Sequence, residues 1–225
     1  MSERLIVALD HPNAATALAQ VDQLGDVVTR YKVGLELYLA EGRALVDDLK
    51  RRHKRIFLDL KLHDIPETVR RAAEIVADYG VELLTVHASG GHKMLEAAAK
   101  GAGATKVLAV TVLTSLDHDD LKRDLSAAGS TEALVVARAK LAEAAGCAGV
   151  IASPLEAAAV RAVVGKGFLV ITPGVRLAAA EDDQKRVATP AAARAAGADA
   201  VVVGRPIRDA ADRKAAAERF VRELA

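Results

Sequence analysis

Short apolar runs rich in β-branched residues alternate along the whole chain with longer, alanine-rich stretches that have helical spacing. Eight runs are expected to be strands, at residues 5–9, 29–33, 55–60, 82–87, 106–111, 149–152, 168–172 and 200–203. Helices are expected at residues 14–24, 37–52, 67–79, 92–100, 131–145, 155–164, 191–196 and 208–224. Such alternation is typical of parallel strands joined by helical crossovers.

The number of strand–helix units predicts the fold class. About eight units in 225 residues fit an α/β protein with a single (β/α)8 TIM barrel of parallel strands. An open doubly wound sheet is the alternative, but no Gly-x-Gly-x-x-Gly motif follows the first strand. Because no linker or low-complexity segment interrupts the pattern, we expect residues 1–225 to form one catalytic domain.

Polar or glycine-containing groups follow nearly every expected strand. In chain order they are Asp10, Lys32 with Gly34, Asp59 with Lys61, His87, Thr114 with Ser115, Ser153-Pro154, Thr172 to Arg176, and Gly204-Arg205. Active sites of (β/α)8 barrels lie at the carboxyl ends of the strands. The pattern therefore predicts a site that draws on most of the strands.

The densest charge lies around the third strand. Asp59 and Lys61 are two residues apart and should share one face of a strand. Together with Asp64 and Lys32 they are expected to form a hydrogen-bonded network of alternating sign at the barrel mouth. A lysine flanked by carboxylates stays protonated at neutral pH and can act as a general acid. A purely structural salt-bridge cluster is the alternative.

A phosphate site is expected after the last two strands. Gly204 allows close approach of an anion, and Arg205 and Arg176 supply positive charge. The polar connection 173–186 is long enough to be a lid, and Gln184 would be one of its ligand contacts. The alternatives are a surface arginine in a turn and a loop without function.

Composition and charge narrow the possible partners. The chain is 52% hydrophobic and only 3% aromatic, with a net charge of +1. Scattered basic residues and few aromatic residues do not favour a nucleic-acid surface. No apolar run approaches the roughly 20 residues that span a bilayer, and the first residues lack a signal-peptide pattern. We therefore expect a cytoplasmic protein without membrane or nucleic-acid partners.

The histidines and the lone cysteine do not predict a metal or redox centre. His87 and His92 lack the further ligands of a complete metal set, so no metal is expected, and the glycine pair between them predicts a tight turn. His11, His53 and His118 are expected on loops or helix surfaces. Cys147 has an apolar neighbourhood and is expected to be an inert core thiol.

Taken together, the motifs resemble the shorter, bacterial type of the orotidine 5'-phosphate decarboxylase family from end to end. Asp-x-Lys-x-x-Asp alone also occurs in related sugar-phosphate lyases, and its extension through Ile65-Pro66-x-Thr68 makes the resemblance specific. The matching segments are 7–10, 31–34, 57–69, 86–88, 110–115, 172–176, 183–184 and 203–205.

The resemblance implies conversion of orotidine 5'-monophosphate to UMP and CO2, the last step of pyrimidine nucleotide synthesis, without metal or organic cofactor. It implies that Lys61, Asp59, Asp64 and Lys32 are catalytic. Asp64 and Thr68 would reach the neighbouring subunit's site in a homodimer. The implied substrate contacts are Asp10, Lys32 and Thr68 to the ribose, Thr114 and Ser115 to the pyrimidine, and Arg176, Gln184, Gly204 and Arg205 to the phosphate.

Two rival functions remain open from the sequence. One is a metal-assisted decarboxylase or aldolase that acts on a phosphorylated sugar with the same barrel. The other is a non-catalytic protein that binds a phosphorylated ligand. The segment Ile65-Pro66-x-Thr68 argues against the first, and a lysine placed between two acids argues against the second.

Overall fold

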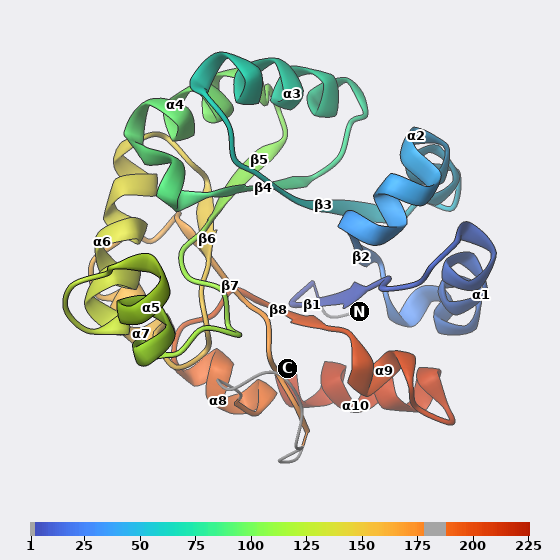
Figure 1. Ribbon diagram of the computed structural model, residues 1–225. Helices are drawn as coiled ribbons and strands as arrows, with labels where there is room; N and C mark the ends of the chain where they lie inside the picture. The colour runs from blue at the N-terminus through green and yellow to red at the C-terminus, as the bar shows by residue number, and fades with distance from the viewer. Residues whose placement is uncertain (1–2, 178–187) are drawn as a thin grey trace.

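A computed structural model describes residues 3–177 and 188–225, and in it parallel strands close into a barrel (Figure 1). Neighbouring strands follow each other in chain order, and β8 pairs with β1 to complete the ring. The strands are β1 (Leu5–Ala8), β2 (Arg30–Gly34), β3 (Arg55–Leu62), β4 (Leu83–His87), β5 (Lys106–Val110), β6 (Gly149–Ile151), β7 (Leu169–Thr172) and β8 (Ala200–Val203). The closed ring confirms the predicted (β/α)8 barrel and rules out the open doubly wound sheet.

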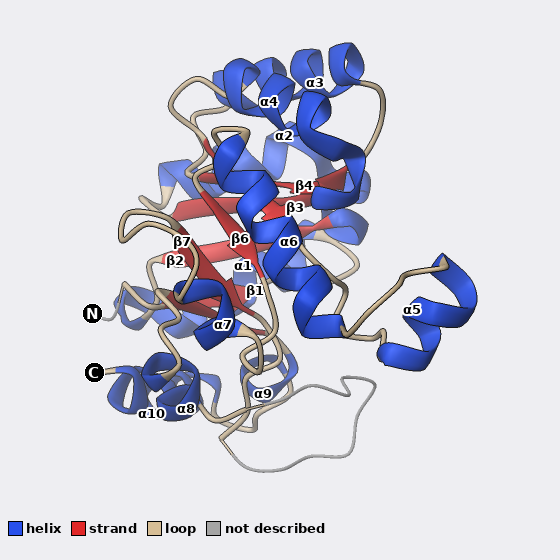
Figure 2. Ribbon diagram, turned by 90° about the vertical axis from the view of Figure 1, so that its left-hand side faces the viewer, coloured by secondary structure: helices blue, strands red, loops and turns tan. Residues whose placement is uncertain are grey.

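Helices surround the barrel as an outer ring (Figure 1). They are α1 (Ala14–Leu24), α2 (Leu35–Arg51), α3 (Pro66–Asp78), α4 (Gly91–Gly101), α5 (His118–Leu125), α6 (Thr131–Ala144), α7 (Ala157–Arg161), α8 (Pro190–Ala195), α9 (Arg205–Arg208) and α10 (Arg213–Leu224). Two 3-10 turns, Gly25–Val27 and Ala88–Gly90, precede β2 and α4. Figure 2 shows α5 standing away from the rest of the barrel.

Side chains alternate between the barrel interior and the layer under the helices, as expected for strands. On β1, Ile6 belongs to the interior cluster, whereas Leu5 and Val7 pack under the helices. The interior cluster consists of Ile6, Ala8, Phe57, Leu83, Leu108, Ile171, Ala200 and Val202. Because this cluster fills the barrel, the polar groups at the strand ends are held above a packed, apolar floor.

The structure differs from the predicted elements after β5 and after β8. Helix α5 was not predicted, because it buries only Leu121 and therefore has no apolar stripe. A capping box between Asp117 and Asp120 begins this helix instead. The helix predicted at 208–224 begins only at Arg213, because Asp212 caps α10 by accepting from the Ala215 N–H. Arg208 is instead the last residue of α9, a short helix that was not predicted.

Other predictions of the sequence analysis agree with the structure. Cys147 is buried, and burial raises the pKa of its thiol to about 12, so the thiol stays protonated at neutral pH. A tight turn at Ala88–Gly90 leads into α4, as the glycine pair predicted. Within residues 3–177 and 188–225, no helix combines the length and the apolar character that crossing a bilayer requires.

Candidate active site

The site begins with an irregularity at the end of β3. Leu58 pairs with Leu84 on β4 and Leu62 pairs with Val86, so four steps along β3 match two steps along β4. Lys61 lies in this bulge with a φ of 51°, in the left-handed region that costs a non-glycine residue about 1–2 kcal/mol. Bulges re-aim side chains next to active sites. Simple strand alternation therefore does not by itself place Lys61 beside Asp59.

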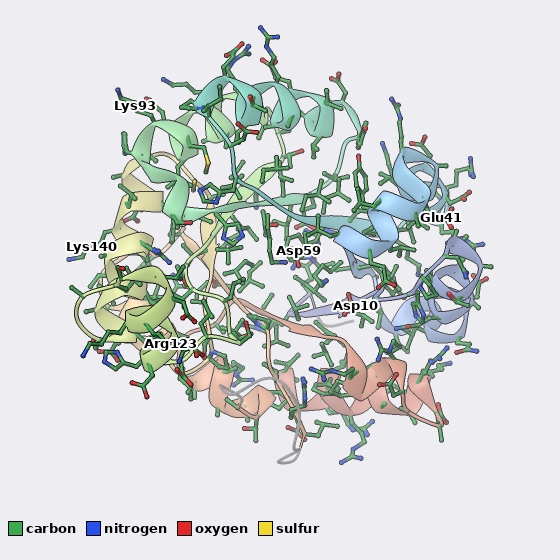
Figure 3. The ribbon with its side chains drawn as sticks, in the orientation of Figure 1. Asp10, Glu41, Asp59, Lys93, Arg123 and Lys140 are labelled. Carbon is green, nitrogen blue, oxygen red and sulfur yellow. The ribbon has the colours of Figure 1, made fainter. Side chains whose placement is uncertain are left out.

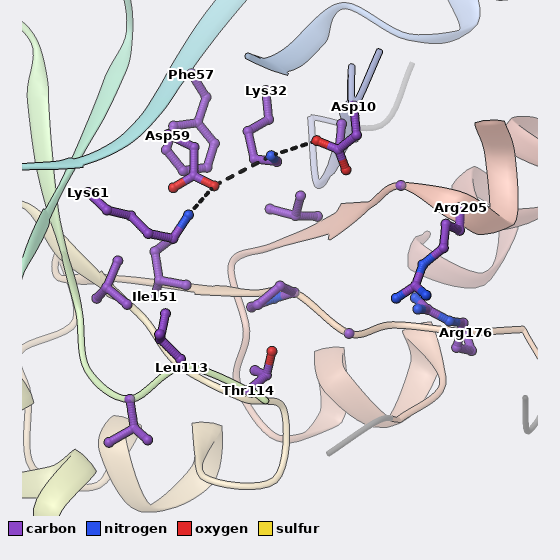
Figure 4. Close-up of a pocket in the computed structure, with 17 residues that line it drawn as sticks. Asp10, Lys32, Phe57, Asp59, Lys61, Leu113, Thr114, Ile151, Arg176 and Arg205 are labelled. Carbon is purple, nitrogen blue, oxygen red and sulfur yellow. Dashed lines mark hydrogen bonds and ion pairs between the residues drawn. The ribbon is translucent and has the colours of Figure 1, made fainter. Parts of the chain in front are cut away.

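Four charged side chains form a network of alternating charge along the mouth of the barrel, the Lys–Asp network. Asp59 Oδ2 lies 2.8 Å from Lys61 Nζ and 3.4 Å from Lys32 Nζ. Lys32 Nζ also donates to Asp10 Oδ1 at 3.1 Å. These ion pairs are the dashed lines of Figure 4. In Figure 3 Asp59 lies near the centre of the ring, whereas the labelled side chains Lys93 and Lys140 lie on its outer helices.

Burial and mutual charge determine the ionisation of the side chains in the Lys–Asp network. Burial alone would raise the pKa of the Asp59 carboxyl, but Lys32 and Lys61, with hydrogen bonds from Lys61 and Thr85, hold that pKa below its usual value. Burial alone would lower the pKa of the Lys32 ammonium, but Asp59 and Asp10 overcome it and raise that pKa. Both groups therefore stay charged at neutral pH, and the carboxylate and ammonium groups hold one another in place.

The Lys–Asp network lines a cavity of about 230 Å³ at the carboxyl ends of the strands (Figure 4). The polar and charged lining consists of Asp10, Lys32, Asp59, Lys61, Thr114, Arg176 and Arg205. The apolar lining includes Phe57, Val110 and Ile151 from three different strands. A cavity with apolar walls and a few convergent charged groups suits a small, anionic ligand.

Arg176 and Arg205 lie across the cavity from Lys61 (Figure 4). Arg205 is the first residue of α9, and Arg176 follows β7 as a buried side chain whose Nη1 donates to the Val175 carbonyl at 3.1 Å. Gly204 also lines the cavity, and a Cβ on it would lie 3.2 Å from Asp10 Oδ2. Glycine at this position therefore leaves room at the cavity wall, and its arginine neighbours supply positive charge.

Three of the predicted residues lie elsewhere. Ser115 is exposed and does not line the cavity, whereas its neighbour Thr114 does. Asp64 and Thr68 are also exposed, on the connection from β3 and on the first turn of α3. Gln184 lies outside the described residues. Ser115, Asp64 and Thr68 are thus not part of the cavity that the described residues form, and the predicted contact of Gln184 stays a prediction.

Asp64 does not join the Lys–Asp network within its own chain, and its expected place at a neighbouring subunit's site stays a prediction. Asp64 Oδ1 accepts from the backbone N–H of Ile65 at 2.6 Å, and the side chain is exposed. The chain turns outward after Leu62, because Ile65 is extended and Pro66 begins α3. Asp10, which was expected only as a ribose contact, takes the outer place in the network instead.

His11 corrects another expectation. It was predicted on a loop or helix surface, but only 7% of it is exposed, and its Nε2 N–H donates to Gln20 Oε1 at 2.5 Å. His53 and His118 are exposed, as predicted. Among residues 3–177 and 188–225, no three His, Cys, Asp or Glu side chains gather in an arrangement that could hold a metal ion.

The sequence analysis missed Thr85, which completes the environment of Asp59. The Thr85 hydroxyl donates to Asp59 Oδ1 at 2.9 Å and accepts from the Lys61 backbone N–H at 2.9 Å. Its signal in the sequence was faint: one polar residue inside the apolar run 83–86. The period of β4 places it on the interior face with Leu83, where an unpaired hydroxyl would be unfavourable.

The closed barrel and the charged cavity at its carboxyl-terminal mouth define a (β/α)8-barrel enzyme. Comparison with known proteins identifies its family. The family model described as "Orotidine 5'-phosphate decarboxylase / HUMPS family" matches residues 3–220. The chain belongs to this family.

Individual relatives agree with this assignment. A protein named orotidine 5'-phosphate decarboxylase from Anaeromyxobacter sp. (strain K) is 55% identical over 225 residues, with 99% of each chain covered. One of the same name from Methylococcus capsulatus is 49% identical, with 97% of this chain and 90% of that protein covered. The crystal structure of orotidine 5'-phosphate decarboxylase from Lactobacillus acidophilus superposes with a TM-score of 0.89 at 39% identity, covering 99% of each chain.

Proposed function

We propose that this protein is a carboxy-lyase that converts orotidine 5'-monophosphate to UMP and CO2, the last step of UMP synthesis, with no metal or organic cofactor. One observation carries the proposal: the Lys61 ammonium, paired with Asp59 at 2.8 Å, faces a cavity whose other side carries Arg176 and Arg205. Relatives named orotidine 5'-phosphate decarboxylase, which are 55% and 49% identical to this chain, support the choice of substrate.

The proposed reaction requires stabilisation of a carbanion. When the bond between C6 and the carboxylate breaks, its electron pair stays on C6 in the plane of the pyrimidine ring, and no conjugated group accepts it. A fixed cation next to C6 stabilises that charge because it needs no reorganisation as the charge develops. Lys61 would take this position and then transfer a proton from Nζ to C6, which completes UMP.

Asp59 would orient the ammonium and destabilise the substrate carboxylate. Its side chain is 12% exposed and its two oxygens contact Lys61, Lys32 and Thr85, so it is held firmly as an anion. A carboxylate bound near this anion is repelled, and the repulsion is relieved when CO2 leaves. Lys32 and Asp10, at the outer end of the Lys–Asp network, would bind the ribose hydroxyls.

The phosphate would bind away from the reacting carbon. Arg205, with its backbone at the first turn of α9, and Arg176 would bind the phosphate oxygens by charge-assisted hydrogen bonds. Thr114 would contact the pyrimidine from the β5 side. Binding energy from the phosphate can be used to hold C6 against Lys61, which raises the rate of the chemical step.

We also propose a homodimer in which each subunit completes the other's site with Asp64 and Thr68. Both side chains are exposed on the β3–α3 connection and α3, outside their own cavity. Large apolar side chains are also exposed next to Asp64 and on α2, the helix between β2 and β3: Ile65 at 67%, and Leu39 and Leu35 at 81% and 48%. A two-fold interface over this surface would cover the apolar residues and create two equivalent shared sites.

Mixing two inactive variants tests the shared site. Lys61→Ala and Asp64→Ala proteins should each be inactive, and their hybrid dimer should contain one site with both native residues. At equal amounts and full exchange, about a quarter of the wild-type activity should return, because half the dimers are hybrids with one intact site each. If verified exchange restores no activity, the shared site is refuted.

An ultraviolet assay that follows loss of orotidine monophosphate separates the proposed function from its rivals. The proposed enzyme turns over this nucleotide in the presence of a chelator. A metal-assisted lyase would instead lose activity with chelator or consume a phosphorylated sugar, but two ammonium groups beside Asp59 disfavour a divalent cation there. A binding protein would turn over neither compound.

The remaining predictions about partners and location rest on the sequence alone. A cytoplasmic location, and the lack of nucleic-acid and membrane partners, stay predictions. Fractionation of cells that express the protein would check the location, and a binding assay with duplex and single-stranded oligonucleotides would check the lack of nucleic-acid partners.

A further inference from the structure

Thr85 is a fully buried polar residue in the middle of an apolar strand. Its relative exposure is 0%, and its neighbours on β4 are Leu84 and Val86. It lies on the interior face of β4, two residues after Leu83 of the interior cluster. Neither substrate binding nor proton transfer in the proposed mechanism uses this hydroxyl.

The Thr85 hydroxyl connects the two halves of the Lys–Asp pair. It accepts a hydrogen bond from the Lys61 backbone N–H at 2.9 Å. It also donates to Asp59 Oδ1 at 2.9 Å, the oxygen of Asp59 that does not contact the lysines. Since an N–H only donates and a carboxylate only accepts, both directions are determined.

The first of these bonds acts on the backbone bulge. Lys61 has a left-handed φ of 51°, and the register between β3 and β4 is interrupted from Leu58 to Leu62. In a regular ladder the Lys61 N–H would donate to a strand carbonyl, whereas here the Thr85 side chain provides the acceptor. A hydroxyl on β4 therefore compensates for the missing ladder bond at the residue that carries the ammonium.

We propose that Thr85 is a positioning residue, whose hydroxyl holds the bulge at Lys61 and the carboxylate of Asp59 in one fixed arrangement, so that the ammonium meets C6 of the substrate. The role of the ammonium rests on the proposed function. Thr85 touches no substrate in this account. It acts through two other residues, as supporting groups around a reacting centre do.

Isosteric substitutions separate the hydroxyl from the shape of the side chain. Thr85→Val keeps the volume but leaves the Lys61 N–H without its acceptor and Asp59 Oδ1 without its donor. Thr85→Ser keeps both hydrogen bonds. Thr105→Val is the matched control, because Thr105 is also a buried threonine whose hydroxyl donates to a backbone carbonyl, that of Val81 at 2.9 Å, at the opposite end of the barrel.

Steady-state kinetics with orotidine monophosphate should show a selective loss of turnover. We expect Thr85→Val to lower kcat by about a hundredfold with KM changed by less than about threefold, because the ammonium is displaced while the phosphate contacts remain. Thr85→Ser should recover most of the wild-type kcat. Thr105→Val should lower the melting temperature and leave kcat unchanged.

Ligand affinities add a readout that a structural role would not move. UMP and a UMP analogue that carries an oxyanion at C6 are compared by calorimetric titration. Thr85→Val should weaken binding of the oxyanion analogue more than binding of UMP, because only the analogue has charge at the carbon that Lys61 faces. An equal loss for both ligands would mean that the substitution merely loosens the cavity.

The outcomes are distinct from failure of the proposed function. If the wild type does not turn over orotidine monophosphate, the proposed function fails. If the wild type is active and Thr85→Val keeps its kcat, or Thr85→Ser is as impaired as Thr85→Val, the positioning role is refuted. Should Thr85→Val not fold, Thr85→Ala replaces it in the same comparison with Thr85→Ser.

Discussion

Two charged networks lie at opposite ends of the barrel, and each links β2 and β3 through a central pair of similar burial. At the amino-terminal end, Arg30 Nε donates to Glu82 Oε2 at 3.1 Å and Arg55 Nη2 donates to Glu82 Oε1 at 2.6 Å. At the carboxyl-terminal end, Lys32 and Lys61 share Asp59. The side chains of Arg30 and Glu82 are 12% and 16% exposed, and those of Lys32 and Asp59 are both 12% exposed.

The difference lies in geometry. The Arg30 guanidinium forms a forked contact with the Glu82 carboxylate, and Arg55 donates one further hydrogen bond to it. These arginines lie on strands in regular register, where Arg30 pairs with Arg55. The ammonium groups of Lys32 and Lys61 are compact charges on flexible side chains, and both line the cavity. The backbone of Lys61 has a left-handed φ. Equal burial therefore does not indicate equal roles: the first network ties strands together, and the second holds charges toward a ligand. Barrels generally separate stability and catalysis between their two ends in this way.

Loss of the Lys61 ammonium should give the largest effect, a loss of activity without a loss of stability. Lys61→Ala should lower kcat by at least about a thousandfold, because the developing charge at C6 loses its fixed cation. The melting temperature should stay close to that of the wild type, since Asp59 keeps Lys32 and Thr85. Lys93→Ala, on the outer surface of α4, is the control and should be fully active. Substantial residual turnover by Lys61→Ala would refute its role as the acid.

Loss of Arg205 should weaken binding rather than chemistry. Arg205→Ala should reduce the affinity for UMP by about 2 kcal/mol, about thirtyfold, as removal of a charge-assisted hydrogen bond does. Isothermal titration with UMP and with uridine would measure it, and the loss should be confined to the phosphorylated ligand. Arg194→Ala, exposed on α8, should bind UMP normally. An unchanged affinity of Arg205→Ala for UMP would place the phosphate site elsewhere.

Disruption of the amino-terminal network should affect stability alone. Glu82→Gln leaves Arg30 and Arg55 without their carboxylate and should lower the free energy of unfolding by about 2 kcal/mol. For a chain of this size that corresponds to a fall in melting temperature of about 4–8 °C. Calorimetry would measure it, and kcat should not change. A matched change at the exposed pair of Glu96 and Lys100, Glu96→Gln, should leave the melting temperature unchanged. A fall in kcat with Glu82→Gln would contradict the proposed separation of roles.

The smallest expected effect is a pH dependence that originates at His87. Burial lowers the pKa of this imidazole, with further lowering from His63, Lys61 and Arg138 and an opposing effect of Asp59. The unfolded chain therefore binds a proton near pH 6.5 that the folded chain binds only at lower pH, so stability falls as the pH drops below 6.5. Melting curves between pH 7.5 and pH 5.5, taken as about one unit on each side of that value, should be less pH-dependent for His87→Gln. His118→Gln, on exposed α5, should match the wild type. Equal slopes for all three proteins would show that His87 titrates normally.

Much of this protein is determined by its sequence. Alternating apolar runs and helical stretches predict the closed barrel, because every strand must bury one face inside the ring and the other under helices. The residues at the strand ends then gather at one mouth, and eight of the predicted positions line the cavity: Asp10, Lys32, Asp59, Lys61, Thr114, Arg176, Gly204 and Arg205. The position of a residue after its strand was sufficient to predict these eight, because the carboxyl ends of the strands in a parallel barrel lie at the same mouth.

Only the tertiary structure decided the rest. The bulge that turns Lys61 toward Asp59 depends on a hydroxyl of β4, more than twenty residues away in the chain, and no period of β3 predicts it. His11 is buried and forms a hydrogen bond with the buried Gln20 of α1. Asp64 points outward although it is only three residues from Lys61. Hydrophobic periodicity reports which face of an element is buried, whereas these placements depend on hydrogen bonds between elements, which exist only after the chain has folded.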